Sequence, residues 1–149
     1  MPNAQLRKIL VELFASQRSA VLATQEGGQP YCSLMAFAAT EDLRSLLFAT
    51  RRATRKYANL AADPRAALLA DNRTNQASDT EAALAVTAVG RAEEVGPAEK
   101  DRLLGIYLAK HPHLKSFLAS EDCALMGLRV ASYYIVSHFQ EVQVLSMTP

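Results

Sequence analysis

The sequence predicts a mainly β fold, a small closed or partly open antiparallel barrel of six or seven strands with three or four peripheral helices. Two observations carry this prediction. Apolar stretches of strand length recur along the chain, and several are joined by short turns that suit antiparallel neighbours rather than a parallel βαβ sheet. No linker, low-complexity segment or internal repeat interrupts residues 1–149, so we expect one domain.

In the first half of the chain we expect a helix over residues 3–17 and strands over 20–24, 31–38 and 45–50. The helix carries its apolar side chains at helical spacing. Gly27 and Gly28 supply the positive φ that a tight reversal between the first two strands needs. The second strand is apolar on both faces, so we expect it to be central in the sheet.

In the second half we expect helices over 54–63, 97–111 and 113–119, a polar loop over 72–80, and strands over 65–71, 82–95, 123–130 and 133–145. The first of these helices ends before Pro64, because the residue preceding proline is disfavoured in the helical region. Its buried side is predicted to carry Tyr57, Leu60 and Ala61. Gly90 lies inside a long strand and predicts a bulge or a bend there.

Composition excludes several classes of partner. Half of the residues are hydrophobic, 21% are charged and the net charge is +1, so no overall basic field favours nucleic acid. The longest apolar runs, such as 66–70 and 82–86, are far too short to cross a bilayer, and no apolar segment of signal-peptide type is present at the start. We expect a cytoplasmic protein in which Cys32 and Cys123 are buried free thiols.

The end of the third predicted strand carries an unusual concentration of charge. Two hydroxyls and four cations follow one another there: Thr50, Arg51, Arg52, Thr54, Arg55 and Lys56. Thr54 is the predicted N-cap of the next helix, which places two cations in its first turn. Such a cation costs about 0.3–1 kcal/mol, because a helix N-terminus already carries roughly half a positive charge. A bound phosphate group would relieve this conflict, and a solvated charged face is the alternative.

A longer pattern contains this stretch. The sequence Phe48-x-Thr50-x-x-x-Thr54-Arg55-Lys56, followed by Asn59-Leu60-x-x-Asp63-Pro64-Arg65, resembles the pyridoxamine 5′-phosphate oxidase-like family of FMN-binding split barrels. Residues 86–93 resemble the next long strand of that family, and the similarity covers most of the chain. The resemblance implies a split β-barrel of six or seven antiparallel strands that forms a homodimer, with FMN in a groove between the subunits.

The resemblance also implies which residues contact the cofactor. The phosphate would be held by Thr50, Thr54, Arg55 and Lys56, with Ala49 against the cofactor and Arg51 as a further candidate. The segment Ser33, Leu34, Met35 and Ala36 would run along the isoalloxazine ring and offer backbone groups to its polar edge. Of Arg51 and Arg52, one is expected to reach the phosphate or ribityl chain and the other to face solvent. An apolar strand beside a cationic helix start suits both ends of FMN.

Departures from the family pattern limit what the resemblance implies about activity. Ala85 stands where the true oxidases place a glutamine, the chain has no tryptophan, and residues 137–142 lack the Arg-x-His block. We therefore do not expect pyridoxamine phosphate oxidase activity. We expect a flavin-dependent oxidoreductase of unknown substrate, with no catalytic side chain nominated. A non-catalytic flavin-binding or redox-sensing protein, or a relative that binds deazaflavin or haem, is the alternative.

The remaining polar candidates receive plainer interpretations. His111 and His113 are expected in an exposed loop without a metal, because no further ligand completes the set. His138 is expected in the last strand, half-buried, with a position facing the cofactor groove or a haem as the alternative. The polar residues 72–76 are expected to be solvated, with a contact to the flavin edge or to the partner subunit as the alternative.

Overall fold

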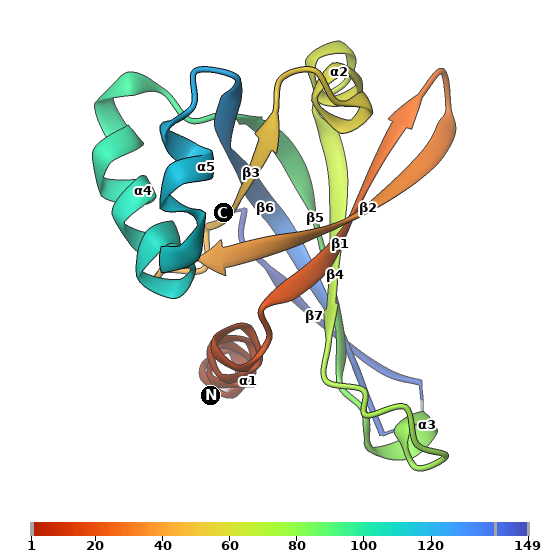
Figure 1. The fold of residues 1–149 in the computed structure, drawn as a ribbon. Helices are drawn as coiled ribbons and strands as arrows, with labels where there is room; N and C mark the ends of the chain where they lie inside the picture. The colour runs from red at the N-terminus through yellow and green to blue at the C-terminus, as the bar shows by residue number, and fades with distance from the viewer. Residues whose placement is uncertain (1, 139, 149) are drawn as a thin grey trace.

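Seven antiparallel strands form one sheet in the order β3-β2-β1-β4-β5-β6-β7. The computed structural model describes residues 2–138 and 140–148. A further pairing of β3 (Ser45–Arg51) with β6 (Cys123–Ser137) closes six strands into a barrel. Strand β7 (Glu141–Ser146) then pairs with the later part of β6, beyond the residues that β3 covers. The predicted mainly β antiparallel barrel with peripheral helices is confirmed, and Figure 1 shows the helices around it.

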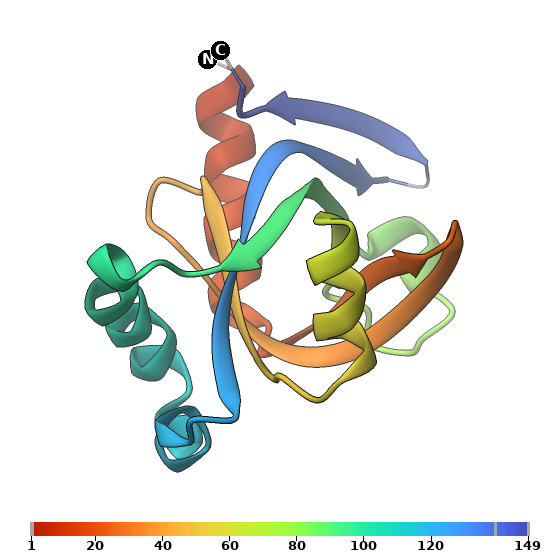
Figure 2. The same cartoon turned by 90° about the horizontal axis from the view of Figure 1, so that it is seen from above.

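The remaining strands are β1 (Ser19–Glu26), β2 (Gln29–Ala39), β4 (Arg65–Asp71) and β5 (Ala85–Glu94). The helices are α1 (Pro2–Ser16), α2 (Arg55–Ala62), α3 (Asp79–Ala82), α4 (Pro97–Lys110) and α5 (Lys115–Ala119), with a 3-10 turn at Pro112–Leu114. Figure 2 shows α4 and α5 together on one side of the barrel, away from α2. None of the helices in the described ranges is long and apolar enough to cross a membrane.

Two apolar clusters hold the fold together. The larger fills the barrel and includes the apolar stripe of α1, where the Phe14 ring meets the Phe37 ring edge-on at 5.5 Å between centroids. The smaller lies under α4, where Leu103 and Tyr107 pack on apolar residues of β2, β3 and β6. Helix α4 is therefore docked against the strands that carry the predicted cofactor residues.

The predicted irregularity at Gly90 is confirmed. The β5–β6 register shifts between Val89 and Gly90, so Gly90 lies opposite Val130 while Val89 lies opposite Ser132. A Cβ atom at Gly90 would overlap the carbonyl oxygen of Arg129. Only glycine permits this close approach of the two backbones.

Two strand boundaries differ from the prediction. Strand β6 continues unbroken to Ser137, and the reversal into β7 occurs near His138 and Gln140, whose φ angles are 45° and 70°. These residues adopt a conformation that glycine usually supplies, so the sequence lacks the usual turn signal; Phe139 lies outside the described residues. Strand β5 begins at Ala85 rather than residue 82, because α3 occupies the preceding residues.

Several burial predictions are wrong. Helix α2 buries Asn59 together with Leu60, whereas Ala61 is exposed. The amide of Asn59 is satisfied inside the protein, since its Nδ2 donates a hydrogen bond to Thr24 Oγ1 at 3.0 Å. Cys123 is buried as expected, whereas Cys32 is exposed on the early part of β2. That part of β2 projects with β1 as a hairpin beyond the barrel (Figure 1), so being central in the sheet does not bury it.

Candidate functional site

The junction of β3 and α2 is built around two threonine hydroxyls. Thr54 caps α2: its Oγ1 accepts from the Tyr57 backbone N–H at 3.3 Å and donates to the Arg51 carbonyl at 2.8 Å. The buried Thr50 places its Oγ1 2.9 Å from Thr54 Oγ1. The predicted N-cap is confirmed, and the hydroxyl pair fixes where the cationic helix start lies relative to the end of β3.

The guanidinium of Arg52 is engaged within the protein. It forms two hydrogen bonds with the Glu94 carboxylate, at 2.5 and 2.7 Å, and one with the Tyr57 hydroxyl at 3.1 Å. The Arg52 hydrogen bond is the main cause that lowers the pKa of Glu94. Arg52 therefore connects the junction to β5, and its side chain is exposed as well as ion-paired. Arg51 lies 5.8 Å from the ring centroid of Phe117 in α5.

The two cations in the first turn of α2 have no such partner. The Arg55 guanidinium lies over the Tyr31 ring, 5.2 Å from its centroid. Neither Arg55 nor Lys56 forms an ion pair with a carboxylate of the described residues. Their charges add to the positive end of the helix, so this junction is a place where an anion would be stabilised.

Strands β2 and β3 separate beside this junction. Their ladder contains only the pairs Phe37–Phe48, Ala38–Leu47 and Ala39–Leu46. Continuing that register would place Met35 opposite Thr50, but the strands diverge there, as Figure 1 shows. The predicted ring-contacting residues 33–36 therefore border this opening on one side, and residues 49–51 border it on the other. Backbone groups of β2 that point towards the opening lie outside the β2–β3 ladder.

The residues predicted to contact the ring differ in orientation and burial. Met35 is buried in the barrel, whereas the side chain of Leu34 is 74% exposed on the outer face. Ser33 and Ala36 are half-buried. The hydroxyl of Tyr107 donates to the Ala36 carbonyl at 3.1 Å, and burial raises the pKa of Tyr107 to about 12. The Ala36 carbonyl, which was predicted to contact the cofactor, is therefore already hydrogen-bonded to Tyr107. Nothing in the sequence predicts this contact.

Apolar side chains cross the outer face of the sheet in one register row. Residues of six successive strands are paired along it: Leu34, Val21, Leu69, Thr87, Tyr134 and Val144. Leu34 and Val144 are more than half exposed, and Leu69 and Tyr134 are about 40% exposed. An exposed apolar band of this kind marks an interaction surface more often than a solvated one.

Two hollows of the surface lie away from the predicted cofactor residues. A cavity of about 830 Å³ lies between the β2–β3 turn, α4 and the bulge of β5 and β6. A second, of about 580 Å³, is bordered by residues of α1, α3 and the β6–β7 turn. None of the ten predicted cofactor residues lines either hollow. Neither of these two hollows therefore corresponds to the cofactor position that the sequence predicts.

The histidines also differ from their predicted settings. His111 is buried rather than exposed, with its Nε2 2.7 Å from the Phe37 carbonyl oxygen, and burial lowers its pKa. His138 is exposed in the β6–β7 turn rather than half-buried in a strand. Within residues 2–138 and 140–148, no three His, Cys, Asp or Glu side chains are placed to hold a metal ion.

The polar loop after β4 is organised from within. The Asp79 carboxylate accepts hydrogen bonds from the backbone N–H groups of Thr74, Asn75 and Gln76. These bonds lower the pKa of Asp79. The three backbone donors are therefore already engaged, which leaves them poorly suited to contact a flavin.

Comparison with known proteins identifies the family. The family model described as pyridoxamine 5′-phosphate oxidase matches residues 6–136. The chain belongs to this family. None of the curated proteins matches the sequence.

Several solved structures share the fold of this chain. A haem-binding protein from Mycobacterium smegmatis has a TM-score of 0.83 at 21% identity, covering 98% of this chain and 58% of its own. ChuZ from Campylobacter jejuni has a TM-score of 0.80 at 17% identity, covering 97% of this chain and 60% of its own. An FAD-binding protein from Mesorhizobium loti has a TM-score of 0.69 at 17% identity, covering 86% and 90%. The chain thus spans little more than half the length of the first of these proteins.

Proposed function

We propose that this chain binds FMN as a homodimer and acts as a flavin-dependent oxidoreductase. The observation that carries the proposal is the junction of β3 and α2. There, a capped helix start with two cations lacking carboxylate partners lies beside the opening between β2 and β3. The family match and the similarity to a flavin-binding protein support the same ligand class.

The phosphate end of FMN would be held by the junction. The cations Arg55 and Lys56 supply donors at the positive end of α2. The hydroxyls of Thr50 and Thr54, which now bond to each other and to the Arg51 carbonyl, would exchange one of these bonds for the phosphate. A hydrogen bond to a charged group contributes about 1.5–3 kcal/mol. Arg51, next to these residues and unbonded to a carboxylate of the described chain, would reach the phosphate or ribityl chain.

The ring of FMN would lie in the opening between the two strands. Residues 33–35 would offer backbone groups to its polar edge, while Ala49 and Thr50 would contact it from β3. The Ala36 carbonyl already accepts from Tyr107, so we expect Ala36 to contribute van der Waals contact instead of a hydrogen bond. The bound flavin would supply the redox chemistry, and the protein residues would bind and orient it.

A second copy of the chain would complete the site. The exposed apolar row on the outer face begins at Leu34, one of the predicted ring contacts. A partner packed on this row would cover the exposed apolar side chains. It would also enclose the cofactor, which contacts from one chain alone would leave exposed to solvent. This links the homodimer and the cofactor groove to the same surface.

The small molecule that co-purifies with the protein tests the proposal. We expect a yellow protein whose released ligand has the mass of FMN, and whose absorption bleaches under anaerobic conditions with NADH or NADPH and returns with air. A bound flavin that neither nucleotide reduces would favour a binding protein without turnover. A deazaflavin mass, or no flavin affinity on reconstitution, would contradict the proposal.

Haem is the second candidate. The M. smegmatis protein is a haem-binding protein, and His138 of this chain has an exposed ring in the β6–β7 turn. A Soret band in the purified protein, lost in a His138→Ala variant, would favour haem over FMN. A Soret band unchanged by that substitution would remove His138 as the ligand.

A further inference from the structure

The larger cavity lies at the opposite end of β3 from the proposed phosphate site. Ser45, at the start of the strand, lines the cavity, whereas Arg51 ends the strand at the junction with α2. At about 3.3 Å per residue the two ends are roughly 20 Å apart. The cavity, of about 830 Å³, is therefore separate from the proposed flavin contacts of the same chain.

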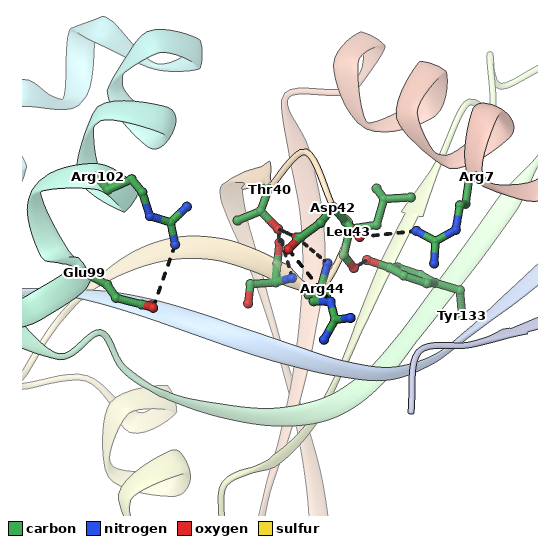
Figure 3. A network of polar contacts seen from close by, with 9 residues as sticks. Arg7, Thr40, Asp42, Leu43, Arg44, Glu99, Arg102 and Tyr133 are labelled. Carbon is green, nitrogen blue, oxygen red and sulfur yellow. Dashed lines mark hydrogen bonds and ion pairs between the residues drawn. The ribbon is translucent and has the colours of Figure 1, made fainter. Parts of the chain in front are cut away.

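One wall of this cavity is a turn held by many hydrogen bonds. Figure 3 shows Thr40, Asp42 and Arg44 bonded to one another, with the Asp42 carboxylate accepting from the Thr40 hydroxyl and the Arg44 backbone N–H at 2.8 and 3.0 Å. The Tyr133 hydroxyl donates to the Leu43 carbonyl from inside the barrel at 2.7 Å. The turn is thus fixed before any ligand arrives.

The floor of the cavity carries two arginines in direct opposition. Arg91 of β5 and Arg129 of β6 are register partners beside the bulge, so their side chains share one face of the sheet. Both are exposed, and neither is ion-paired with a carboxylate of the described residues. Like charges directly opposite each other destabilise a strand pair, and an anion between them would remove the repulsion.

The acidic residues of the cavity do not provide that anion. Asp42 accepts the hydrogen bonds of its own turn and lies 3.9 Å from Arg44. Glu99 of α4 lies 3.9 Å from Arg102, one turn along the same helix, as Figure 3 shows. Glu41 is the third carboxylate of the lining, and Arg44 and Arg102 border the same cavity. The four arginines and three carboxylates give the lining a net charge of +1, and the arginines of the lining that have no carboxylate partner among the described residues are Arg91 and Arg129.

Apolar side chains border the cavity as well. Ile106 of α4 and Met147 are half-buried and line it, whereas the lining residues Leu103 and Val130 are only 5% and 4% exposed. The volume falls within the range of small-molecule sites, which is about 300–1,000 Å³. A simple inorganic ion would use the arginines and leave this apolar surface bare.

We propose that this cavity binds an amphipathic organic anion. Its carboxylate or phosphate head would lie between the guanidinium groups of Arg91 and Arg129, and its apolar body would pack on the half-buried Ile106 and Met147. Guanidinium groups bind such heads bidentately, which fixes orientation as well as charge. This second site does not depend on the proposed flavin function, since it uses none of the residues assigned to FMN.

Fluorescence titration with 8-anilinonaphthalene-1-sulfonate tests the proposal on the intact protein, because the probe combines an anionic head with an apolar body. We expect saturable binding of one probe per chain. Dodecanoate or dodecyl phosphate should displace it, and the better competitor identifies the head group. Inorganic phosphate at the same concentration should not displace it. Displacement by neither amphiphile, or equally well by inorganic phosphate, would overturn the proposal.

Two variants locate the binding. Arg91→Gln/Arg129→Gln should weaken probe binding at least tenfold, and Arg102→Glu, which brings a negative charge to the opposite wall, should weaken it independently. Arg73→Gln, at an exposed arginine outside the cavity, is the matched control and should bind as the parent protein does. The cofactor spectrum should stay unchanged in all three. The thermal unfolding temperature should be no lower than that of the parent, and it should rise in Arg91→Gln/Arg129→Gln because the repulsion between the two arginines is removed. Parent-like probe binding in both cavity variants would overturn the assignment.

Discussion

Neighbouring arginines of the same short segment have different roles. Arg52 is bonded to Glu94 and Tyr57, whereas Arg55 lies on the Tyr31 ring without a carboxylate partner in the described chain. Their order in the sequence gives no hint of this difference, because it depends on Glu94, which is 42 residues away. A change at Arg52 should therefore affect how the junction is held, and a change at Arg55 should affect what the junction binds.

Asn59 provides a first prediction at the residue scale. Its side chain is buried in α2 and donates to the Thr24 hydroxyl of β1. Asn59→Ala should lower the free energy of unfolding by about 1–3 kcal/mol, because the change removes a buried hydrogen bond. Urea unfolding measures this change, and Gln5→Ala, which removes an exposed amide of α1, is the control that should leave the stability nearly unchanged. Equal stability of Asn59→Ala and the parent would contradict the assigned contact.

Lys110 provides a prediction about pH. Its ammonium group donates to the Phe14 carbonyl of α1 at 2.7 Å and lies 4.0 Å from the Phe37 ring centroid, and burial lowers its pKa to about 8. The unfolded chain holds this proton up to about pH 10.5, so the contribution of Lys110 to stability should rise between about pH 8 and pH 10.5. The difference in unfolding free energy between the parent and Lys110→Met, measured by urea at pH 7 and pH 9.5, should change in that direction. A pH-independent difference would contradict it.

At the scale of elements, the sequence predicted the helix caps, helix ends and bulges that depend on one or two neighbouring residues. Three predicted features follow from the conformational limits of single residues: the Thr54 cap, the helix end before Pro64 and the irregularity at Gly90. The hydrogen bond from the Tyr57 backbone N–H confirms the cap, and the shift in the β5–β6 register confirms the irregularity. The β6–β7 reversal was missed because His138 and Gln140 adopt positive φ without being glycine. The burial of His111 depends on the distant Phe37 carbonyl, and no local pattern announces such a partner.

Two glycines provide a matched prediction for the bulge. Gly90→Ala would push a methyl group into the Arg129 carbonyl and should destabilise the protein by about 1–3 kcal/mol. Gly105, exposed in α4 with no atom within 4 Å of a Cβ position, is the control. Gly105→Ala should stabilise by about 0.5–1 kcal/mol, since alanine favours the helix. Thermal unfolding of both variants compares them, and a harmless Gly90→Ala would show that the bulge is not tightly packed.

At the scale of the whole molecule, we propose that the exposed apolar row and the cofactor groove belong to one surface, because both include Leu34. The register row runs across six strands from Leu34 to Val144, and neither of the two hollows described above includes the predicted flavin contacts. The sequence resemblance implied a dimer without saying which face it uses. We propose that the dimer uses the face that carries the register row, because strand pairing aligns apolar residues there that are distant in sequence.

Leu34 tests this surface. Leu34→Lys should leave the fold intact, because the side chain is already 74% exposed, and should shift the protein from dimer towards monomer. Val11→Lys, at an exposed valine of α1 outside the row, is the control and should leave assembly unchanged. Sedimentation equilibrium over a range of concentrations measures both. A dimer of unaltered strength in Leu34→Lys would place the interface elsewhere.

The dissociation constant of FMN tests the central claim most directly. Arg55→Ala/Lys56→Ala removes the two cations at the start of α2, and Arg73→Ala/Lys115→Ala removes two exposed cations elsewhere, so both variants have the same net charge. We expect the first to bind FMN at least a hundredfold more weakly than the parent, about 2.7 kcal/mol, and the second to bind it normally. Equal affinity of the two variants would contradict the placement of the phosphate at the β3–α2 junction.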